Sequence, residues 1–169
     1  MAPLLSGFVR ILQFDGEIKH FVPQAAFSLS LFILVPMLWW SMWLFRDVEW
    51  HFGTYFYMII EPAALFIACS LIFPQRVDHH SINLEEHFYK IRIPLLTSLM
   101  AVGGLAFADG VVIAAEPVWH ERRYVQVFFL AILAWGLIDK RRMAQHVSAI
   151  GALLVEGILI SIWFWMPAG

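Results

Sequence analysis

Long apolar stretches alternate with short polar ones along the chain, and this pattern predicts helices that cross a membrane. A helix needs about 20 mostly apolar residues to cross a hydrocarbon core of roughly 30 Å. Five stretches stand out, at residues 24–44, 52–73, 93–115, 124–138 and 145–165. The stretch 124–138 is short enough to be a re-entrant segment instead of a full span. We therefore expect an all-α integral membrane helical bundle, with about five transmembrane helices, that forms one domain over residues 1–169.

Two polar-to-apolar patterns predict further helical structure. Near the N-terminus, apolar side chains at helical spacing predict an amphipathic helix in the membrane interface: Leu4, Leu5, Phe8, Ile11 and Leu12. Before the third stretch, Asn83 followed by Glu86 resembles a capping box, and Glu86 with Lys90 forms an i, i+4 pair. A short helix is therefore expected from Leu84 into the third span, bent near Pro94.

The composition supports a membrane environment and argues against a nucleic-acid partner. Apolar residues make up 61% of the chain and charged residues 14%, against about 25% charged in soluble domains. The formal net charge is −2, so no basic field is present to attract nucleic acid. The lipid bilayer is therefore the first partner that we expect.

Basic residues are unevenly divided between alternate connecting segments, and this predicts an orientation. With five spans, eight of them lie on the side of the N-terminus: Arg10, Lys19, Arg76, Lys90, Arg92, Lys140, Arg141 and Arg142. Three lie on the other side: Arg46, Arg122 and Arg123. With these five spans, the positive-inside rule predicts a cytoplasmic N-terminus and an external C-terminus. If the fourth span is left out, the bias disappears.

Three carboxyl side chains lie inside the predicted spans. Glu61 is near the midpoint of the second span, Glu156 is near the midpoint of the fifth, and Asp109 is in the outer half of the third. A charged carboxylate at the bilayer centre costs about 2.5–3.5 kcal/mol on insertion scales, and no Lys or Arg is expected at comparable depth. The three acids are therefore candidates for a proton or ion pathway. If the helices of Glu61 and Glu156 are neighbours, these two could share a proton.

A structural role is the alternative for each acid. Glu61 precedes Pro62, which frees a backbone carbonyl, so a protonated Glu61 could bond to backbone or to Tyr57. Asp109 precedes Gly110 and could cap a broken helix. Small residues at four-residue spacing allow helices to approach closely, with packing as the default explanation: Ala64 and Ala68, Gly104 and Ala108, Ser148 and Ala152, Gly157 and Ser161.

No segment carries a catalytic or cofactor motif. Ser-x-x-Lys, His-Glu-x-x-His and Gly-x-Ser-x-Gly are absent, as are the paired transmembrane histidines of a b-type haem site. A polar loop gathers histidines and acids at spacings that suit zinc poorly: Asp78, His79, His80, Glu85, Glu86 and His87. We expect a solvated loop there, no metal and no cofactor, and an enzymatic role is not favoured.

Three segments together carry a resemblance to a protein family. They are Pro3–Leu12, Trp39–Trp40 near the end of a span, and Arg46–Trp50 before a span that closes on Phe73–Pro74. With these segments the chain resembles an uncharacterised family of small bacterial inner-membrane proteins. The resemblance covers roughly the first half of the chain and the approach to the third span. It implies a location in the bacterial inner membrane and no activity or site residue. Family members carry an extra apolar helix before the Leu-Leu-Ser-Gly segment, which this sequence starts without.

The sequence leaves three functions open. The first is a non-catalytic membrane component that packs with itself, as a homo-oligomer, or with a membrane-protein partner. The second is a proton-coupled small-solute carrier or ion pathway that uses Glu61 and Glu156, as a homodimer because five spans are few for a carrier. The third is an intramembrane enzyme for lipid or isoprenoid substrates, for which the loop residues are poorly arranged. Convergence of the three carboxyls on a polar cavity, within a hydrogen-bonding distance of about 3 Å, would favour the second function over the first. Acids on separate packed faces would leave structure as their explanation.

Overall fold

Helices account for nearly all of the regular structure. The computed structural model describes residues 2–46, 49–75, 81–113 and 121–161. The α-helices in these residues are α1 (Ala2–Leu12), α2 (Val22–Met42), α3 (Phe52–Leu71), α4 (Leu84–Val112), α5 (Glu121–Ile138) and α6 (Arg142–Leu159). A 3-10 turn, η1 (Trp43–Phe45), follows α2, and two short strands are β1 (Glu17–Lys19) and β2 (Ser81–Asn83). The predicted all-α class is confirmed.

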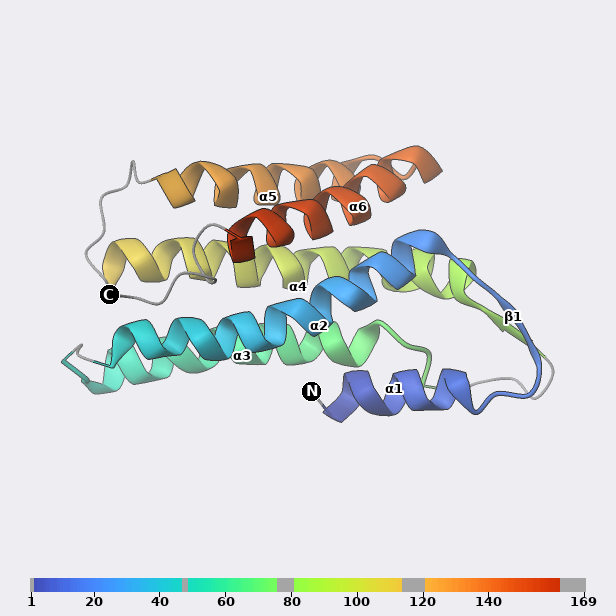
Figure 1. The fold of residues 1–169 in the computed structure, drawn as a ribbon, viewed down its shortest axis with the longest axis horizontal. Helices are drawn as coiled ribbons and strands as arrows, with labels where there is room; N and C mark the ends of the chain where they lie inside the picture. Colours follow the sequence, from blue (N-terminus) through green and yellow to red (C-terminus); the bar gives the residue numbers. More distant parts are fainter. Residues whose placement is uncertain (1, 47–48, 76–80, 114–120, 162–169) are drawn as a thin grey trace.

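The helices α2 to α6 lie side by side along the longest dimension of the molecule (Figure 1). In this view α4 lies in the middle, with α5 and α6 on one side and α2 and α3 on the other. The closest packing joins α3 with α4, α2 with α6, α5 with α6, and α4 with α5. Successive helices run in opposite directions, so α2, α4 and α6 all begin at the end of the bundle where β1 lies.

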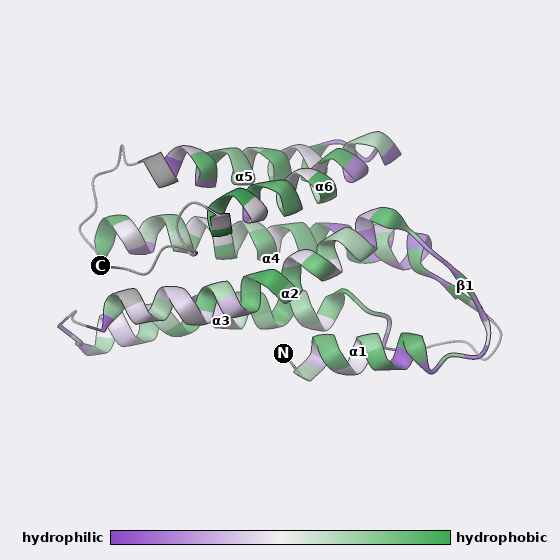
Figure 2. Cartoon of the chain, in the orientation of Figure 1, coloured by the Kyte–Doolittle hydropathy of each residue, from purple (hydrophilic) through white to green (hydrophobic). Residues whose placement is uncertain are grey.

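Three of the helices, α2, α3 and α4, are long and apolar enough to cross a membrane. Hydrophobic residues run along the helices, and hydrophilic ones gather at the end with β1 (Figure 2). Large apolar side chains cover much of the outer surface, among them Leu29, Phe56, Ile67, Phe128 and Leu154. A soluble monomer rarely exposes an apolar surface this continuous. The membrane character is thus supported for three helices, while the count of five spans stays a prediction.

Helix α4 begins where the capping pattern predicts. The Asn83 side chain accepts a hydrogen bond from the Glu86 backbone N–H at 3.2 Å. One turn later the Lys90 ammonium lies 2.8 Å from the Glu86 carboxylate. The predicted short helix and the third span are one continuous helix of 29 residues, with Pro94 inside it.

Helix α5 is longer than the apolar stretch 124–138 that predicted it. It begins three residues earlier, at Glu121, and contains 18 residues. At 1.5 Å per residue its length is about 27 Å. The helix runs from one end of the bundle to the other without turning back (Figure 1).

Helix α1 forms as predicted, and it lies beside one end of α3, along the long axis of the bundle (Figure 1). Gly7 packs so closely on Phe73 that a Cβ atom at Gly7 would lie 2.5 Å from the Phe73 ring. Arg10 donates hydrogen bonds to the carbonyl oxygens of Pro74 and Gln75, at 3.0 and 2.8 Å. These contacts attach α1 to the C-terminal end of α3, and its predicted place in the membrane interface stays a prediction.

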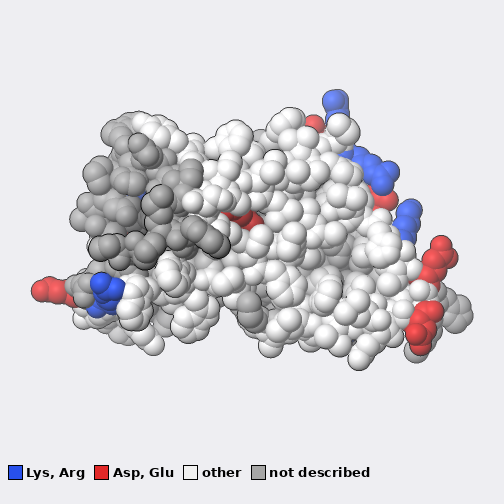
Figure 3. All heavy atoms as spheres, in the orientation of Figure 1, with Lys and Arg blue, Asp and Glu red and all other residues white. Residues whose placement is uncertain are grey.

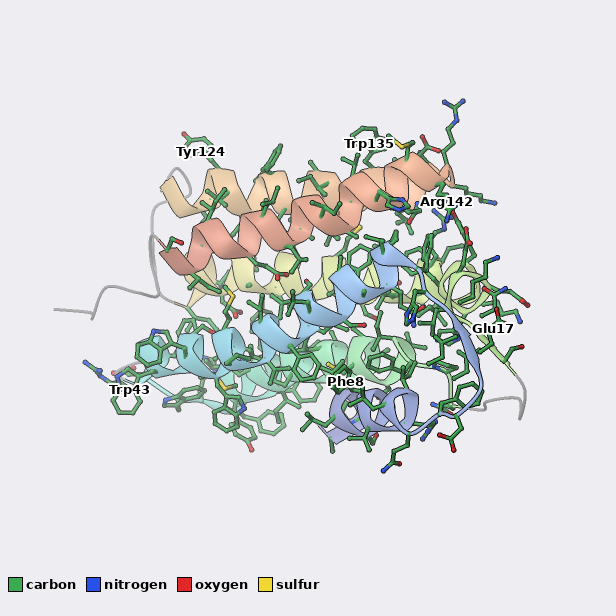
Figure 4. The ribbon with its side chains drawn as sticks, turned by 45° about the vertical axis from the view of Figure 1, so that its right-hand side comes forward. Phe8, Glu17, Trp43, Tyr124, Trp135 and Arg142 are labelled. Atoms are coloured by element: carbon green, nitrogen blue, oxygen red, sulfur yellow. The ribbon has the colours of Figure 1, made fainter. Side chains whose placement is uncertain are left out.

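Two strands that the sequence pattern does not predict join the N-terminal segment to the start of α4. They pair in parallel, with Glu17 opposite Ser81. Nearby, the Glu85 carboxylate lies 3.9 Å from the Lys19 ammonium and 3.6 Å from the Arg142 guanidinium. Figure 4 shows Glu17 and Arg142 at this end and Trp43 at the opposite one. The charged end of the bundle is thus assembled from three separate segments.

Buried polar side chains close the C-terminal end of α5. Arg92, which is 3% exposed, donates to the carbonyl oxygens of Gly136 and Leu137 at 2.7 and 3.1 Å. Gln145 donates to the carbonyl oxygens of Gly136 and Asp139 at 2.8 and 2.6 Å. The last carbonyls of a helix have no partner within the helix, so Arg92 and Gln145 supply partners from α4 and α6.

Gly136→Ala should destabilise the bundle. A Cβ atom at Gly136 would lie 2.7 Å from the Ser148 Cβ, so α5 and α6 would have to separate. Overpacking of this kind costs about 1–3 kcal/mol, which exceeds the gain of up to about 1 kcal/mol in helix propensity. Unfolding by SDS in mixed micelles measures the change.

The matched control is Gly104→Ala, because nothing lies within 4 Å of a Cβ atom at Gly104. This variant should be as stable as the parent chain or slightly more stable. Equal stability of the two variants would contradict the close α5–α6 contact.

Candidate functional site

The three predicted acids line one cavity inside the bundle. Glu61 reaches it from α3, Asp109 from α4 and Glu156 from α6, and the cavity volume is about 110 Å³. Helices α2 and α5 complete the lining, so each helix from α2 to α6 contributes. The other lining residues are apolar except Ser41 and Gln126. The three acids thus share one mainly apolar cavity, in which Glu61 and Asp109 interact with each other and Glu156 interacts with neither.

The acids are set apart from the other charged side chains of the molecule. Glu61 is 7% exposed, Asp109 is 4% exposed and Glu156 is fully buried. The charged side chains on the face in Figure 3 gather at its two ends, apart from one small acidic area near the middle of that face. The acids thus lie inside an apolar bundle, where a carboxylate is costly unless a partner or a proton compensates it.

Glu61 and Asp109 contact each other directly. Their carboxyls interact across the contact between α3 and α4. Two carboxylates so close in an apolar interior repel each other, and a proton shared between them would relieve that repulsion. Tyr57, one turn before Glu61, also interacts with Asp109, and its hydroxyl donates to the Leu105 carbonyl at 3.3 Å.

The partner of Glu61 differs from the one that the sequence suggests. Sharing a proton with Glu156 requires neighbouring helices, but α3 packs against α4, while α6 packs against α2 and α5. Asp109, and not Glu156, is therefore the carboxyl that interacts with Glu61. The helix continues through Asp109 to Val112, so Asp109 does not cap a broken helix.

Arg123, in the first turn of α5, brings a positive charge to Asp109. Its side chain is 2% exposed and donates to the Phe107 carbonyl at 2.7 Å and to Gln126 Oε1 at 3.0 Å. A Cβ atom at Gly110 would overlap the guanidinium, so the glycine leaves room for it. The expectation that no Arg lies near the acids is wrong, because Arg123 folds inward onto α4.

Glu156 is held separately from this group. The Ser30 hydroxyl of α2 donates a hydrogen bond to Glu156 Oε1. Glu156 Oε2 has no hydrogen-bond partner among the described residues. No Lys or Arg in the described part of the chain compensates its charge. Glu156 is therefore the buried acid whose charge lacks a protein counter-ion in these segments.

Sequence reasoning missed four contributors to the site, and each left only a weak signal. Ser30 is a hydroxyl residue inside the first apolar stretch. Arg123 and Gln126 have i, i+3 spacing at the start of α5, which places them on one helix face. Gly110 follows Asp109 directly, but its role of leaving room for Arg123 can be recognised only when α5 is known to pack beside it.

The polar loop residues belong to a different part of the molecule. The His87 ring lies 3.0 Å from the Leu71 carbonyl oxygen, while Glu85 and Glu86 form ion pairs. Within residues 2–46, 49–75, 81–113 and 121–161, no three His, Cys, Asp or Glu side chains are grouped to hold a metal. Three loop residues and the ends of two predicted spans lie outside the described residues: Asp78, His79, His80, 114–115 and 162–165.

The interpretation of the cavity rests on its own chemistry. Three carboxyls, one guanidinium, a carboxamide and two hydroxyls from Ser30 and Ser41 gather there within an apolar bundle. No family model, curated protein or solved structure matches the chain.

Proposed function

We propose that this chain is a multi-pass inner-membrane protein that passes protons through its central cavity and couples them to the movement of a small solute. The observation that carries the proposal is the convergence of Glu61, Asp109 and Glu156 on one cavity. Midplane carboxyls that face a shared cavity are typical of proton-coupled carriers. Acids that served packing alone would have no reason to meet in one place.

The charge balance of the cavity supports a role for protons. Three carboxyls face one guanidinium, that of Arg123, so full ionisation would leave an excess of negative charge in an apolar interior. The Glu61 and Asp109 carboxyls lie close enough to interact, so a proton held between them would lower their mutual repulsion. Glu156 has no cationic partner in the described segments, so a proton or a bound cation would have to compensate it.

The proposed orientation has α2 to α6 crossing the bilayer, with the N-terminus in the cytoplasm. At the end where α2, α4 and α6 begin, the described basic residues are Arg10, Lys19, Lys90, Arg92, Lys140, Arg141 and Arg142. Arg46 and Arg123 lie toward the other end. The positive-inside rule favours a cytoplasmic location for the end with more basic residues.

Single cysteines test this orientation. In a Cys69→Ala background, Glu49→Cys and Ser81→Cys place an exposed thiol near each end of the bundle. A membrane-impermeant maleimide should label Glu49→Cys on intact cells and Ser81→Cys only after the cells are opened. The reverse labelling pattern, or labelling of both on intact cells, would contradict the proposed topology.

Proton entry into liposomes tests the function. Purified protein is reconstituted with a pH-sensitive dye inside, and a potassium gradient with valinomycin makes the interior negative. Wild-type liposomes should acidify faster than empty ones. Glu61→Gln and Glu156→Gln should acidify like empty liposomes, because glutamine keeps the shape and the hydrogen bonds of glutamate but cannot release a proton.

The matched control for proton entry is Glu86→Gln, since Glu86 is an exposed acid paired with Lys90 at the end of the bundle. This variant should acidify like wild type. Wild-type liposomes no faster than empty ones, or normal entry in both cavity variants, would contradict the proposal.

Helix packing with another copy or a partner is the second candidate, and the outer face of α6 favours it. Nothing lies within 4 Å of a Cβ atom at Gly157. The apolar side chains around it, Ile150, Leu154 and Ile158, are exposed. A small residue within an apolar face lets a second helix approach closely. The two candidates are compatible, because a carrier of five spans is expected to act as a homodimer.

Gly157→Leu should prevent self-association. The added side chain would occupy the space into which a second helix packs. Light scattering of the protein in mild detergent should show a dimer for wild type and for Gly104→Leu, and a monomer for Gly157→Leu. A wild-type protein that is strictly monomeric and without a partner would contradict packing through this face.

A further inference from the structure

Glu156 is the feature of the cavity that remains incomplete without a ligand. It is fully buried, and one of its two carboxyl oxygens accepts a hydrogen bond from the Ser30 hydroxyl. The other oxygen, Oε2, is buried and has no partner among the described residues. A buried acceptor left without a partner costs about 1–3 kcal/mol, and more when it is charged.

The other charged groups near the cavity interact with one another. Asp109 on α4 interacts with Glu61 on α3 and with the positive charge of Arg123 on α5, although its Oδ1 atom has no hydrogen-bond partner among the described residues. The Arg123 guanidinium also bonds to Phe107 and to Gln126. From α2 the cavity receives the Ser41 hydroxyl and no charged group, while the Ser30 hydroxyl reaches Glu156. A cation that entered the cavity would therefore find its uncompensated charge at Glu156.

The size and lining of the cavity restrict that cation. A cavity of about 150 Å³ holds benzene, so 110 Å³ admits a ligand of no more than about six heavy atoms. The lining near Glu156 includes Leu34, Leu38, Phe129 and Leu159, which suit an apolar chain. Ca²⁺ and Mg²⁺ prefer six or more oxygen ligands, and the described residues hold no group of three His, Cys, Asp or Glu side chains for a metal ion. An organic cation with a short apolar body fits these limits.

We propose that the cavity binds a small primary alkylammonium ion, whose charged head pairs with Glu156 and whose alkyl chain lies against the apolar lining. The proposal rests on the proton-linked function above and names its substrate class. In the empty cavity a proton neutralises Glu156. When the ammonium ion binds, that proton leaves to solution and the ammonium replaces it, so one positive charge is exchanged for another. The exchange is the step that would couple solute movement to a proton.

Binding and proton release in detergent test this proposal without a membrane. The purified protein in weak buffer is titrated with n-butylammonium chloride, while calorimetry measures binding and an indicator dye measures released protons. Wild type should bind and release one proton per ammonium ion. Butan-1-ol, which has the same chain without the charge, should bind much more weakly.

Variants separate Glu156 from the other acids. Glu156→Gln should weaken n-butylammonium binding by about 30-fold or more, the loss expected when one partner of a buried charge pair is removed, and should abolish proton release. Glu86→Gln should behave as wild type. Ala106→Leu enlarges a cavity-lining residue of α4 and leaves all three acids in place, so it should also lose binding. It keeps the proposal testable if Glu156→Gln fails to fold.

Four results would overturn the inference: no binding to wild type, equal binding to Glu156→Gln, unchanged binding to Ala106→Leu, or equal affinity for butan-1-ol. These results are distinguishable from failure of the proposed function. Proton entry into liposomes without n-butylammonium binding would remove only the substrate class. Binding without proton entry would contradict the pathway and leave the ammonium site in place.

Discussion

Hydrogen bonds from buried polar side chains to neighbouring helices determine how this bundle is assembled. Gln24 of α2 donates to the Ile72 carbonyl beyond α3 at 2.6 Å, and Arg92 of α4 donates to the Gly136 carbonyl of α5 at 2.7 Å. Large apolar side chains cover much of the outer surface, and an unsatisfied polar group in an apolar environment costs several kcal/mol. Each bond therefore favours one particular pair of helices over others that would satisfy the apolar contacts equally well.

Some buried polar atoms do not meet this constraint. Ser30 donates to one oxygen of Glu156, and Asp109 interacts with Glu61 and Arg123. One oxygen of Asp109 and one of Glu156 have no partner in the described segments, and both residues line the cavity. Outside the cavity, Gln24 Oε1, Gln145 Oε1 and Ser148 Oγ also have none. The two cavity atoms differ from these because they belong to carboxyls, which the proposed protons or small cation would compensate.

Local sequence patterns predicted the elements of this fold well. Apolar runs located α2 to α4, and the Asn83–Glu86 pattern located the first residue of α4. Both signals act within a few residues, so they can be read without knowing the fold. The three acids of the site were found by the same reasoning, because a carboxyl inside an apolar run is conspicuous wherever its helix lies.

What the sequence could not give is the neighbours of each side chain. The partner of Glu61 depends on which helix packs on α3, and no local pattern specifies that order. Arg123 could extend outward to the interface or fold inward, and the packing against Gly110 selects the second. The pairing of β1 with β2 joins segments about 60 residues apart, each three residues long, too short to show a strand period.

Infrared difference spectroscopy tests the central claim most directly, because the carbonyl stretch of a protonated carboxyl is distinct from that of a carboxylate. At neutral pH the wild-type protein in detergent should show bands from protonated, buried carboxyls. Glu156→Gln should remove one band, and Asp109→Asn should remove another by breaking the proton-sharing pair with Glu61. A spectrum without protonated carboxyls at neutral pH, or one that neither substitution alters, would contradict the account.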